Sequence, residues 1–190
     1  NGPLFLNESL PGRLSEGEAF IHPELFQILT VIRSKFSNVI KITTNGSTLT
    51  PDLVSKLLNF RPFEITISFP STNIQHWTET FNLKDEHFHI ARNSFQLLKA
   101  NNIGVIASVT PMPSWLGWEE LENTFKFLSE NTKSFIIYAP GYTKKSKIID
   151  KLKYDKMELS LFLEKMGKKY DFKYNWVLDP RKELYISYDS

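Results

Sequence analysis

Five short segments of this chain combine hydroxyl, amide, carboxylate, glycine and proline residues between an apolar stretch and a following amphipathic stretch. They are residues 16–18, 43–46, 68–72, 110–115 and 139–143. The segments hold few charges, whereas a polyphosphate ligand needs lysine and a glycine-rich cradle. Their composition therefore favours a zwitterionic or nucleoside-like ligand, provided that the fold brings the segments together.

Apolar, β-branched strands alternate with amphipathic helices along the sequence. The predicted strands are residues 12–16, 39–44, 64–69, 104–110 and 134–139. The predicted helices are residues 23–36, 51–58, 90–101, 119–130 and 156–170. Residues 176–187 differ, because they predict two short strands around residues 179–182 in the arrangement of a β-hairpin. The alternation predicts an α/β fold with a parallel sheet, in which the ends of the strands carry the functional groups.

Composition bounds the class of protein. The chain has 190 residues, of which 41% are hydrophobic and 23% charged, as in ordinary globular domains. The formal net charge of +2 gives no argument for a nucleic-acid partner. No apolar run approaches the roughly 20 residues that a membrane helix needs, and no signal segment is present, so a cytoplasmic protein without membrane contact is expected. The absence of cysteine excludes disulfides, thiolate catalysis and thiolate metal sites within this chain.

Three motifs resemble those of radical S-adenosylmethionine (radical SAM) enzymes. Residues 15–25 read Ser-Glu-Gly-Glu-Ala-Phe-Ile-His-Pro-Glu-Leu and resemble the family's Gly-Gly-Glu-Pro segment with its His-Pro-Glu-Leu-type helix start. Residues 43–46, Thr-Thr-Asn-Gly, are similar to its Thr-Asn-Gly turn, and residues 65–69 fall where the family has an Ile-Ser-Leu-type fourth strand. The resemblance covers residues 12–145 and gains specificity because the motifs follow one another at βα spacing.

The resemblance implies roles for five residues. Glu18 matches the motif glutamate, whose carboxylate accepts hydrogen bonds from the methionyl ammonium of S-adenosylmethionine (SAM). Gly17 matches the second motif glycine, which lets the backbone approach the ligand. Asn45 lies in the matching turn, and Ser68 matches a polar position that contacts the methionyl carboxylate or the ribose. Ala139 ends the strand whose backbone would face the adenine.

The resemblance also implies the architecture and what is missing from it. It implies a partial (β/α)6 TIM-like barrel as a single domain over residues 1–190, with residues 12–145 as barrel core and residues 146–190 as a C-terminal helix and hairpin. The family's first strand carries a Cys-x-x-x-Cys-x-x-Cys loop that binds a [4Fe–4S] cluster; this chain contains no cysteine and is expected to lack that strand. Two motif positions also differ, because Glu16 replaces a glycine and Ala19 replaces the proline.

The expected function is therefore part of a radical SAM oxidoreductase, activating or modifying enzyme. The complete enzyme would bind SAM and the cluster, take an electron from a donor and generate a 5′-deoxyadenosyl radical, whereas this chain alone is expected to be inactive. Its substrate class, whether protein, RNA or small molecule, is left open. The alternative is a degenerate barrel that binds a ligand or a protein without catalysis, which the changes at Glu16 and Ala19 favour.

Simpler interpretations stand beside these. Glu16 and Glu18 also fit a solvated loop, and Asn45 with Gly46 fits an ordinary turn, here between a strand and a proline-started helix. His87 and His89 suggest a metal site but point about 200° apart on a helix, so a solvated helix start is expected.

Two further segments are open to a binding or a structural interpretation. Residues 115–118, Trp-Leu-Gly-Trp, fit either stacking on a base or an ordinary loop that packs its aromatic rings under a helix. The lysine-rich residues 144–156 fit an anionic substrate such as RNA, but interspersed acids favour a solvated face.

Overall fold

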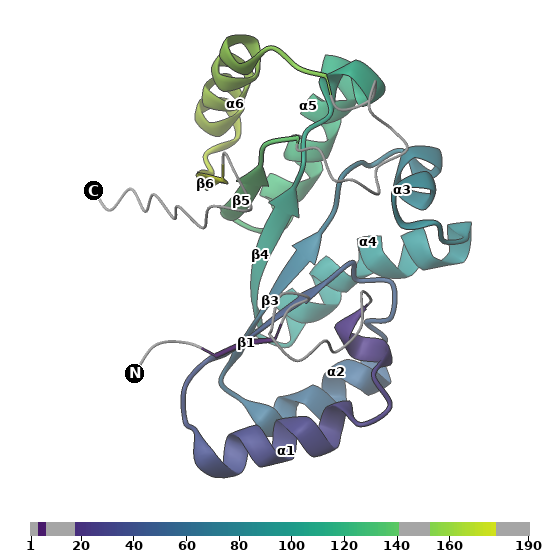
Figure 1. Cartoon of the computed structure of the whole chain (residues 1–190), viewed down its shortest axis with the longest axis vertical. Coiled ribbons are helices and arrows are strands. Elements are labelled where there is room, and N and C mark those ends of the chain that lie inside the picture. The colour runs from purple at the N-terminus through teal and green to yellow at the C-terminus, as the bar shows by residue number, and fades with distance from the viewer. Residues whose placement is uncertain (1–3, 7–17, 141–152, 178–190) are drawn as a thin grey trace. The chain divides into compact units, whose positions relative to one another are not determined.

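Strands and helices alternate through the residues that the computed structural model describes, which are 4–6, 18–140 and 153–177 (Figure 1). The strands are β1 (Leu4–Leu6), β2 (Ile40–Thr44), β3 (Phe63–Ser68), β4 (Gly104–Val109), β5 (Ser134–Tyr138) and β6 (Lys173–Val177). The α-helices are α1 (Leu25–Lys35), α2 (Pro51–Leu57), α3 (Ile74–Phe81), α4 (Asp85–Ala100), α5 (Pro113–Asn131) and α6 (Lys156–Tyr170). Two short 3₁₀ helices are η1 (Ala19–Ile21) and η2 (Leu58–Phe60).

The strands form a parallel sheet whose order follows the chain from β1 to β6. Ile42 of β2 pairs in register with Leu6 of β1 and Ile65 of β3, and all three strands run in the same direction. Ile137 of β5 pairs in the same way with Val109 of β4 and Trp176 of β6. The predicted α/β class with parallel strands is therefore confirmed.

The chain forms two compact units. The first comprises residues 1–68 and 83–106, and the second comprises residues 69–82 and 107–190. Strand β4 begins in the first unit and ends in the second, as residues 104–106 belong to one and 107–109 to the other.

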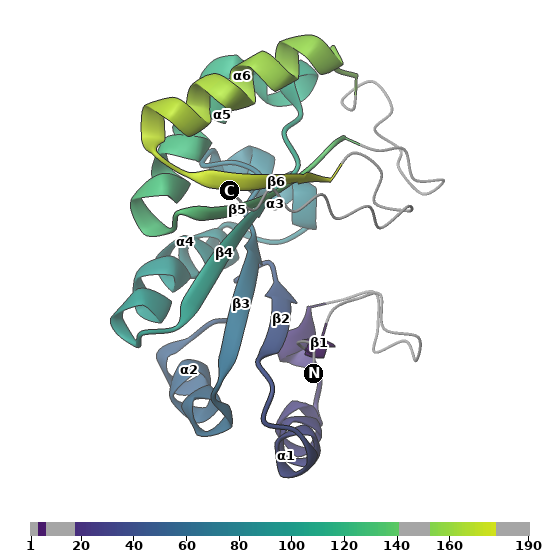
Figure 2. The same ribbon diagram turned by 90° about the vertical axis from the view of Figure 1, so that its left-hand side faces the viewer.

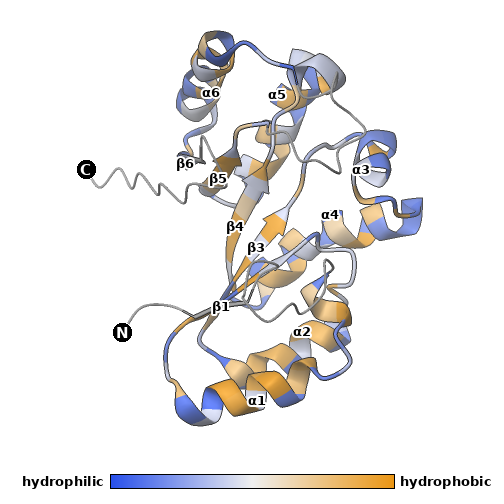
Figure 3. Ribbon diagram, in the orientation of Figure 1, coloured by the Kyte–Doolittle hydropathy of each residue, from blue (hydrophilic) through white to orange (hydrophobic). Residues whose placement is uncertain are grey.

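The first unit has a core between one face of β2 and β3 and the helices beside them. Alternate strand residues are buried, with Ile40, Ile42, Ile65 and Ile67 at most 1% exposed. This alternation is the period of two expected of a strand that covers a core on one face. Figure 2 shows α2 and α4 on this side of the strands, and Figure 3 shows how much of α1 is hydrophobic.

The opposite face of β2 and β3 is polar. The Lys41 ammonium lies 2.9 Å from a Glu64 carboxylate oxygen, and both side chains are about one-third exposed. Side chains two residues apart share a face of a strand, and Ser68 is four residues after Glu64 in β3. Ser68 therefore lies on the same face as Glu64. The candidate ligand residue at the end of β3 is thus on the polar side of the strand, away from the core.

Arg33 of α1 ties the first unit together at the start of β3. Its guanidinium donates to the Phe60 carbonyl at 2.7 and 3.1 Å and to the Pro62 carbonyl at 2.9 Å. It also donates to the carbonyls of Phe36 and Asn38 at 3.0 and 2.9 Å. Four carbonyls from two segments, residues 36–38 and 60–62, thereby receive donors from one planar guanidinium, a geometry that an ammonium cannot reproduce.

The Arg33→Lys variant is expected to lose about 1–3 kcal/mol of unfolding free energy, because several of these carbonyls lose a charged donor. Urea unfolding followed by far-ultraviolet circular dichroism measures the change. Lys35→Gln is the matched control, since Lys35 is an exposed cation of the same helix. Equal losses in the two variants would contradict this role of Arg33.

The second unit has an aromatic core under α6. The rings of Phe125, Phe135 and Phe172 stack, with centroids 5.5 Å apart for Phe125 and Phe172 and 4.1 Å apart for Phe135 and Phe172. Leu159 and Leu163, one helical turn apart on α6, are fully buried. Helix α6 begins and ends where the sequence predicts it.

Several elements differ from the predictions. The short strand β1, helix α3 and strand β6 were not predicted, and α4 begins at Asp85 instead of residue 90. The loop predicted over residues 110–115 and 115–118 is shorter than expected, because α5 already begins at Pro113. The helix is interrupted at Gly117, whose φ of 76° and ψ of 159° are not helical, so Trp115 lies before this break and Trp118 after it. The predicted strand 12–16 and residues 178–187 of the predicted hairpin lie outside the described residues, while residues 176–177 belong to β6.

No helix among the described residues combines the length and the apolar character that crossing a bilayer requires.

Candidate cofactor-binding site

Glu18 joins two of the predicted motifs. One carboxylate oxygen, Oε1, accepts hydrogen bonds from the Thr44 hydroxyl and from the Phe20 backbone N–H, the latter at 3.3 Å. The other oxygen, Oε2, accepts the Asn45 backbone N–H at 2.8 Å. Glu18 precedes η1, and Thr44 ends β2. A half-buried carboxylate thus connects the segment before α1 with the carboxyl end of β2.

The turn after β2 is fixed by its own hydrogen bonds. The Thr44 hydroxyl oxygen accepts the Gly46 N–H at 2.9 Å, and the Asn45 side-chain oxygen accepts the Ser47 N–H at 2.8 Å. The chain then enters α2, where the Thr50 hydroxyl caps the helix by accepting the Leu53 N–H at 3.3 Å. The prediction that this turn leads from a strand into a helix is confirmed.

Gly46 is required by two separate features of this turn. Its φ is +79°, in the left-handed region that side chains disfavour. A Cβ atom there would lie 3.1 Å from the Ser94 hydroxyl oxygen and 3.3 Å from the Ala91 Cα, both on α4. The glycine therefore sets the close approach of the turn to α4, which in turn fixes the Thr44 hydroxyl and the Asn45 N–H that face Glu18.

The remaining predicted site residues are distributed as follows. Ser68 ends β3 one residue beyond Ile67, which pairs with Thr44, so it lies at the same strand edge as the Glu18 junction. Ala139 directly follows β5, is 3% exposed and belongs to the second unit. Gly17 and Glu16 lie outside the described residues. The structure therefore brings Glu18 and Asn45 into contact and places Ser68 at the same edge of the first unit.

Glu120 of α5 organises a second polar cluster that the sequence does not reveal. Its Oε1 accepts hydrogen bonds from the Ser71 hydroxyl at 2.7 Å, from the Thr72 N–H at 2.7 Å and from the Thr72 hydroxyl at 2.9 Å. The same oxygen accepts the Asn73 N–H at 3.0 Å and the Thr124 hydroxyl at 3.1 Å. These donors fix the loop between β3 and α3.

The environment of Glu120 keeps it ionised. Burial acts to raise the pKa of the carboxyl, but the hydrogen bonds from Ser71, Thr72, Asn73 and Thr124 outweigh it, so the pKa lies below its usual value. The Asn73 side chain also caps α3 by accepting the Gln75 N–H at 2.9 Å. The Ser-Thr-Asn sequence before the helix could have indicated this cap. That the same loop donates hydrogen bonds to Glu120, 47 to 49 residues away, could not be inferred from the sequence.

The other candidate sites predicted from the sequence, the histidine pair and the lysine-rich segment, form no metal or anion site among the described residues. His87 and His89 lie in the first turns of α4, so the predicted helix start is confirmed. No group of three histidine, aspartate or glutamate side chains in residues 4–6, 18–140 and 153–177 is arranged to hold a metal. Most of the lysine-rich residues 144–156 lie outside the described residues.

No family model and no curated protein matches this sequence. Solved structures do share its fold. A domain of pyruvate-formate lyase-activating enzyme from Bacteroides vulgatus has a TM-score of 0.67 at 10% identity, over 94% of this chain and 100% of that one. SuiB from Streptococcus suis has a TM-score of 0.57 at 18% identity, and its structure bound to S-adenosylmethionine has 0.57 at 17%.

These matches define the fold class of the chain. The expected partial TIM-like architecture is confirmed by these shared folds. The match with SuiB covers 86% of this chain and 37% of SuiB. The match with the SAM-bound structure covers 84% of this chain and 35% of that one. The chain thus spans about a third of SuiB and the whole of the pyruvate-formate lyase-activating domain.

Proposed function

We propose that this chain is the SAM-binding part of a radical SAM enzyme, with Glu18 as the ligand for the methionyl ammonium of SAM. The observation that carries the proposal is the hydrogen-bonded junction of Glu18 with Thr44 and Asn45. It joins two segments that were predicted separately from family motifs, at the strand edge where parallel α/β folds bind ligands. The shared fold with a SAM-bound protein supports it.

The donor and acceptor set of the first unit suits SAM. A carboxylate has about four acceptor positions, so the Glu18 oxygens can serve an ammonium group together with the protein donors. The Thr44 and Asn45 donors orient the carboxylate before a ligand arrives, which removes an ordering cost on binding. Ser68 supplies a hydroxyl for the methionyl carboxylate or the ribose. Gly17, assigned to the same ligand by resemblance, belongs to the proposal as well.

A [4Fe–4S] cluster does not fit the residues of this chain. Such clusters are held by cysteine thiolates, and the sequence contains none. The described residues also lack any alternative cluster of metal ligands. In the proposed enzyme the cluster ligands lie outside these 190 residues, and this chain contributes the binding and orientation of SAM.

A second candidate is a ligand-binding or protein-binding module without radical chemistry. It is favoured by one feature of the site, since both oxygens of Glu18 already accept hydrogen bonds from the protein. In such a module the glutamate serves only to fasten η1 to the end of β2. The two functions differ in what substitution of Glu18 does to ligand affinity.

The Glu18→Gln variant of the complete protein, as its gene encodes it, is expected to bind SAM about 10- to 100-fold more weakly. The reason is that a charge-assisted hydrogen bond contributes about 1.5–3 kcal/mol and each 1.4 kcal/mol is a factor of ten. Isothermal titration calorimetry under anaerobic conditions measures the affinity. Glu24→Gln is the control, because Glu24 is exposed and its side chain does not cap α1.

Equal affinities of the Glu18→Gln variant and the unchanged protein would contradict the ligand role. A fall in affinity that merely follows a fall in the thermal unfolding temperature would favour the fastening role instead.

A further inference from the structure

Helix α6 exposes a continuous stripe of residues on the side away from the core. Leu159, Leu163 and Met166 are buried, whereas Met157 and Leu161 are 69% and 60% exposed. Residues 157, 161, 165 and 168 follow at intervals of four, four and three, so they lie on one face of the helix. The outer face of α6 is thus apolar in its first half.

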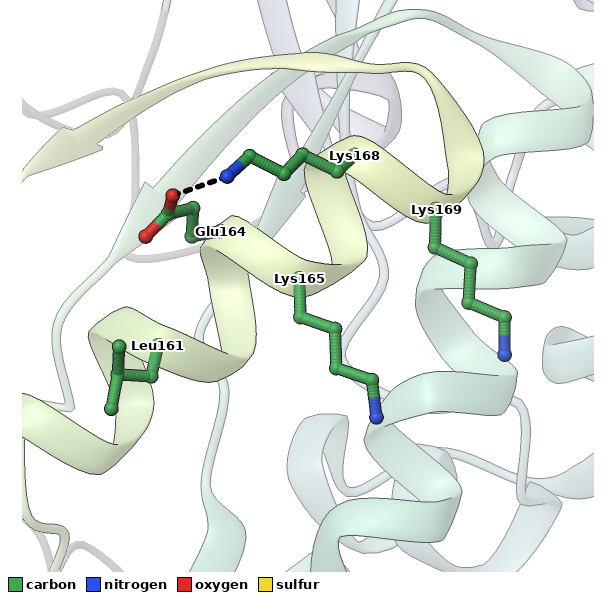
Figure 4. A pocket seen from close by; sticks show the side chains of 5 residues that line it. All are labelled: Leu161, Glu164, Lys165, Lys168 and Lys169. Carbon is green, nitrogen blue, oxygen red and sulfur yellow. Dashed lines mark hydrogen bonds and ion pairs between the residues drawn. The ribbon is translucent and has the colours of Figure 1, made fainter.

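The second half of the same stripe is basic. Lys165, Lys168 and Lys169 are exposed, and with Leu161 and Glu164 they line a shallow hollow of ≈ 510 Å³. Figure 4 shows the side chains of Lys165 and Lys169 extending in the same direction from the helix, while Lys168 reaches Glu164. The hollow combines an exposed leucine with three ammonium groups.

The ion pairs within this surface are weak enough to exchange. Lys168 contacts Glu164 at 2.6 Å and Lys169 contacts Glu122 of α5, and these side chains are all 30% exposed or more. Exposed pairs of this kind contribute little to stability, typically 1 kcal/mol or less. Lys165 is not within ion-pair distance of a carboxylate among the described residues, although its charge acts on the nearby Glu122. Carboxylates of a partner can therefore replace the internal ones and also engage Lys165.

We propose that the outer face of α6, defined as Met157, Leu161, Lys165, Lys168 and Lys169, docks an acidic segment of a partner protein that carries one large apolar residue. The apolar residue would cover Leu161, and the carboxylates would lie over the lysines. Leu161 and Lys169 are eight residues apart, which is about 12 Å along a helix. An extended segment spans that length with about four residues, so a short linear motif suffices.

The chemistry of this face favours a peptide over a nucleic acid. A phosphate backbone is bound by neutralising many phosphates at once, whereas this face offers three lysines, two of which are paired with Glu164 and Glu122. The exposed Met157 and Leu161 offer apolar area that a phosphate backbone does not use. This surface does not depend on SAM, so its test is independent of the proposed enzymatic function.

The test uses the 190-residue chain and a fluorescein-labelled 12-residue peptide with one leucine and four glutamates placed three to six positions after it. Fluorescence anisotropy is expected to show saturable binding that weakens as salt rises from about 50 to 300 mM, because screening shortens the Debye length. A peptide with glutamines in place of the glutamates is expected to bind at least tenfold more weakly.

Variants locate the binding on α6. Lys165→Glu is expected to weaken binding of the acidic peptide about tenfold or more, and Leu161→Ser roughly five- to thirtyfold. Lys126→Glu is the matched control, because Lys126 is an exposed lysine of α5 in the same unit but outside the hollow. Circular dichroism confirms that each variant is folded.

Three results would overturn the proposal. They are equal binding by Lys165→Glu and the unchanged chain, equal binding of the glutamine peptide, and tighter binding of a 12-nucleotide single-stranded RNA than of the acidic peptide.

Discussion

The Glu120→Ala variant is expected to lose about 3–4 kcal/mol of unfolding free energy in the second unit, because one oxygen of Glu120 accepts five hydrogen bonds. One hydrogen bond to a charged group contributes about 1.5–3 kcal/mol to stability. In the variant, the donors that water can reach recover part of this by bonding to water. Intrinsic fluorescence during urea unfolding reports this unit, since the four tryptophans, at positions 77, 115, 118 and 176, all belong to it.

Two further variants show that the effect belongs to this carboxylate. Glu119→Ala changes the neighbouring glutamate, which is exposed, and is expected to change stability by less than about 0.5 kcal/mol. Glu120→Gln keeps an acceptor oxygen but removes the charge, so an intermediate loss is expected. A Glu120→Ala loss no larger than that of Glu119→Ala would contradict the role of this cluster.

The lowered pKa of Glu120 adds a pH dependence with a defined sign. Because the pKa is lower in the folded state, the ionised carboxylate stabilises the fold above its unfolded pKa, whose reference value is 4.5. That contribution is lost as the pH falls below this value toward the folded pKa. The difference in unfolding free energy between the unchanged protein and Glu120→Gln is therefore expected to shrink on acidification below about pH 4.5.

The second large effect concerns the turn that holds Glu18. Gly46→Ala is expected to lower the unfolding free energy of the first unit by about 2–4 kcal/mol, since a positive φ costs about 1–2 kcal/mol for an alanine and the overlap with α4 adds to it. The added Cβ would lie 3.1 Å from the Ser94 hydroxyl oxygen and 3.3 Å from the Ala91 Cα, so the turn or α4 must shift by a few tenths of an ångström. The same shift would displace the Asn45 N–H from Glu18 and weaken ligand binding.

The first unit contains neither tryptophan nor tyrosine, so its stability needs another probe. Amide hydrogen exchange of residues 40–57 reports it directly. Gly104→Ala is the control, because the nearest atom to its Cβ, the Glu64 Cγ, is 3.8 Å away and its φ is not positive. If both alanine variants exchanged at equal rates, the strain at Gly46 would be refuted.

The sequence predicts those strands and helices in which apolar residues recur at the spacing of a strand or a helix. Strand β2 alternates buried and partly exposed positions, β3 is rich in buried apolar residues, and α6 carries its buried residues at helical spacing, so the predicted bounds agree with the structure to within one residue. Helix α3 was missed although Ile74, Trp77 and Phe81 follow at helical spacing, because it has only eight residues and Trp77 is the one buried among them. Strand β6 was missed because it reads Lys-Tyr-Asn-Trp-Val, without a continuous apolar run.

The candidate site was predicted in part for a similar reason. Glu18 and Asn45 come from motifs with local signatures, and Asn45 directly follows the carboxyl end of β2, where parallel α/β folds place functional residues. The cluster of Glu120 depends on a contact between a loop and a distant helix, and neither segment alone carries a pattern that requires the other. Long-range hydrogen bonds of this kind are determined by packing and are not written in sequence spacing.

Reductive cleavage of SAM by the complete protein tests the central claim most directly. After anaerobic reconstitution with iron and sulfide, the protein encoded by the full gene is expected to convert SAM to 5′-deoxyadenosine and methionine when a reductant is added, and Glu18→Gln is expected to slow this at least tenfold at limiting SAM. Absence of 5′-deoxyadenosine from a protein that has bound its cluster would contradict the radical SAM assignment, as would a full gene without three clustered cysteines.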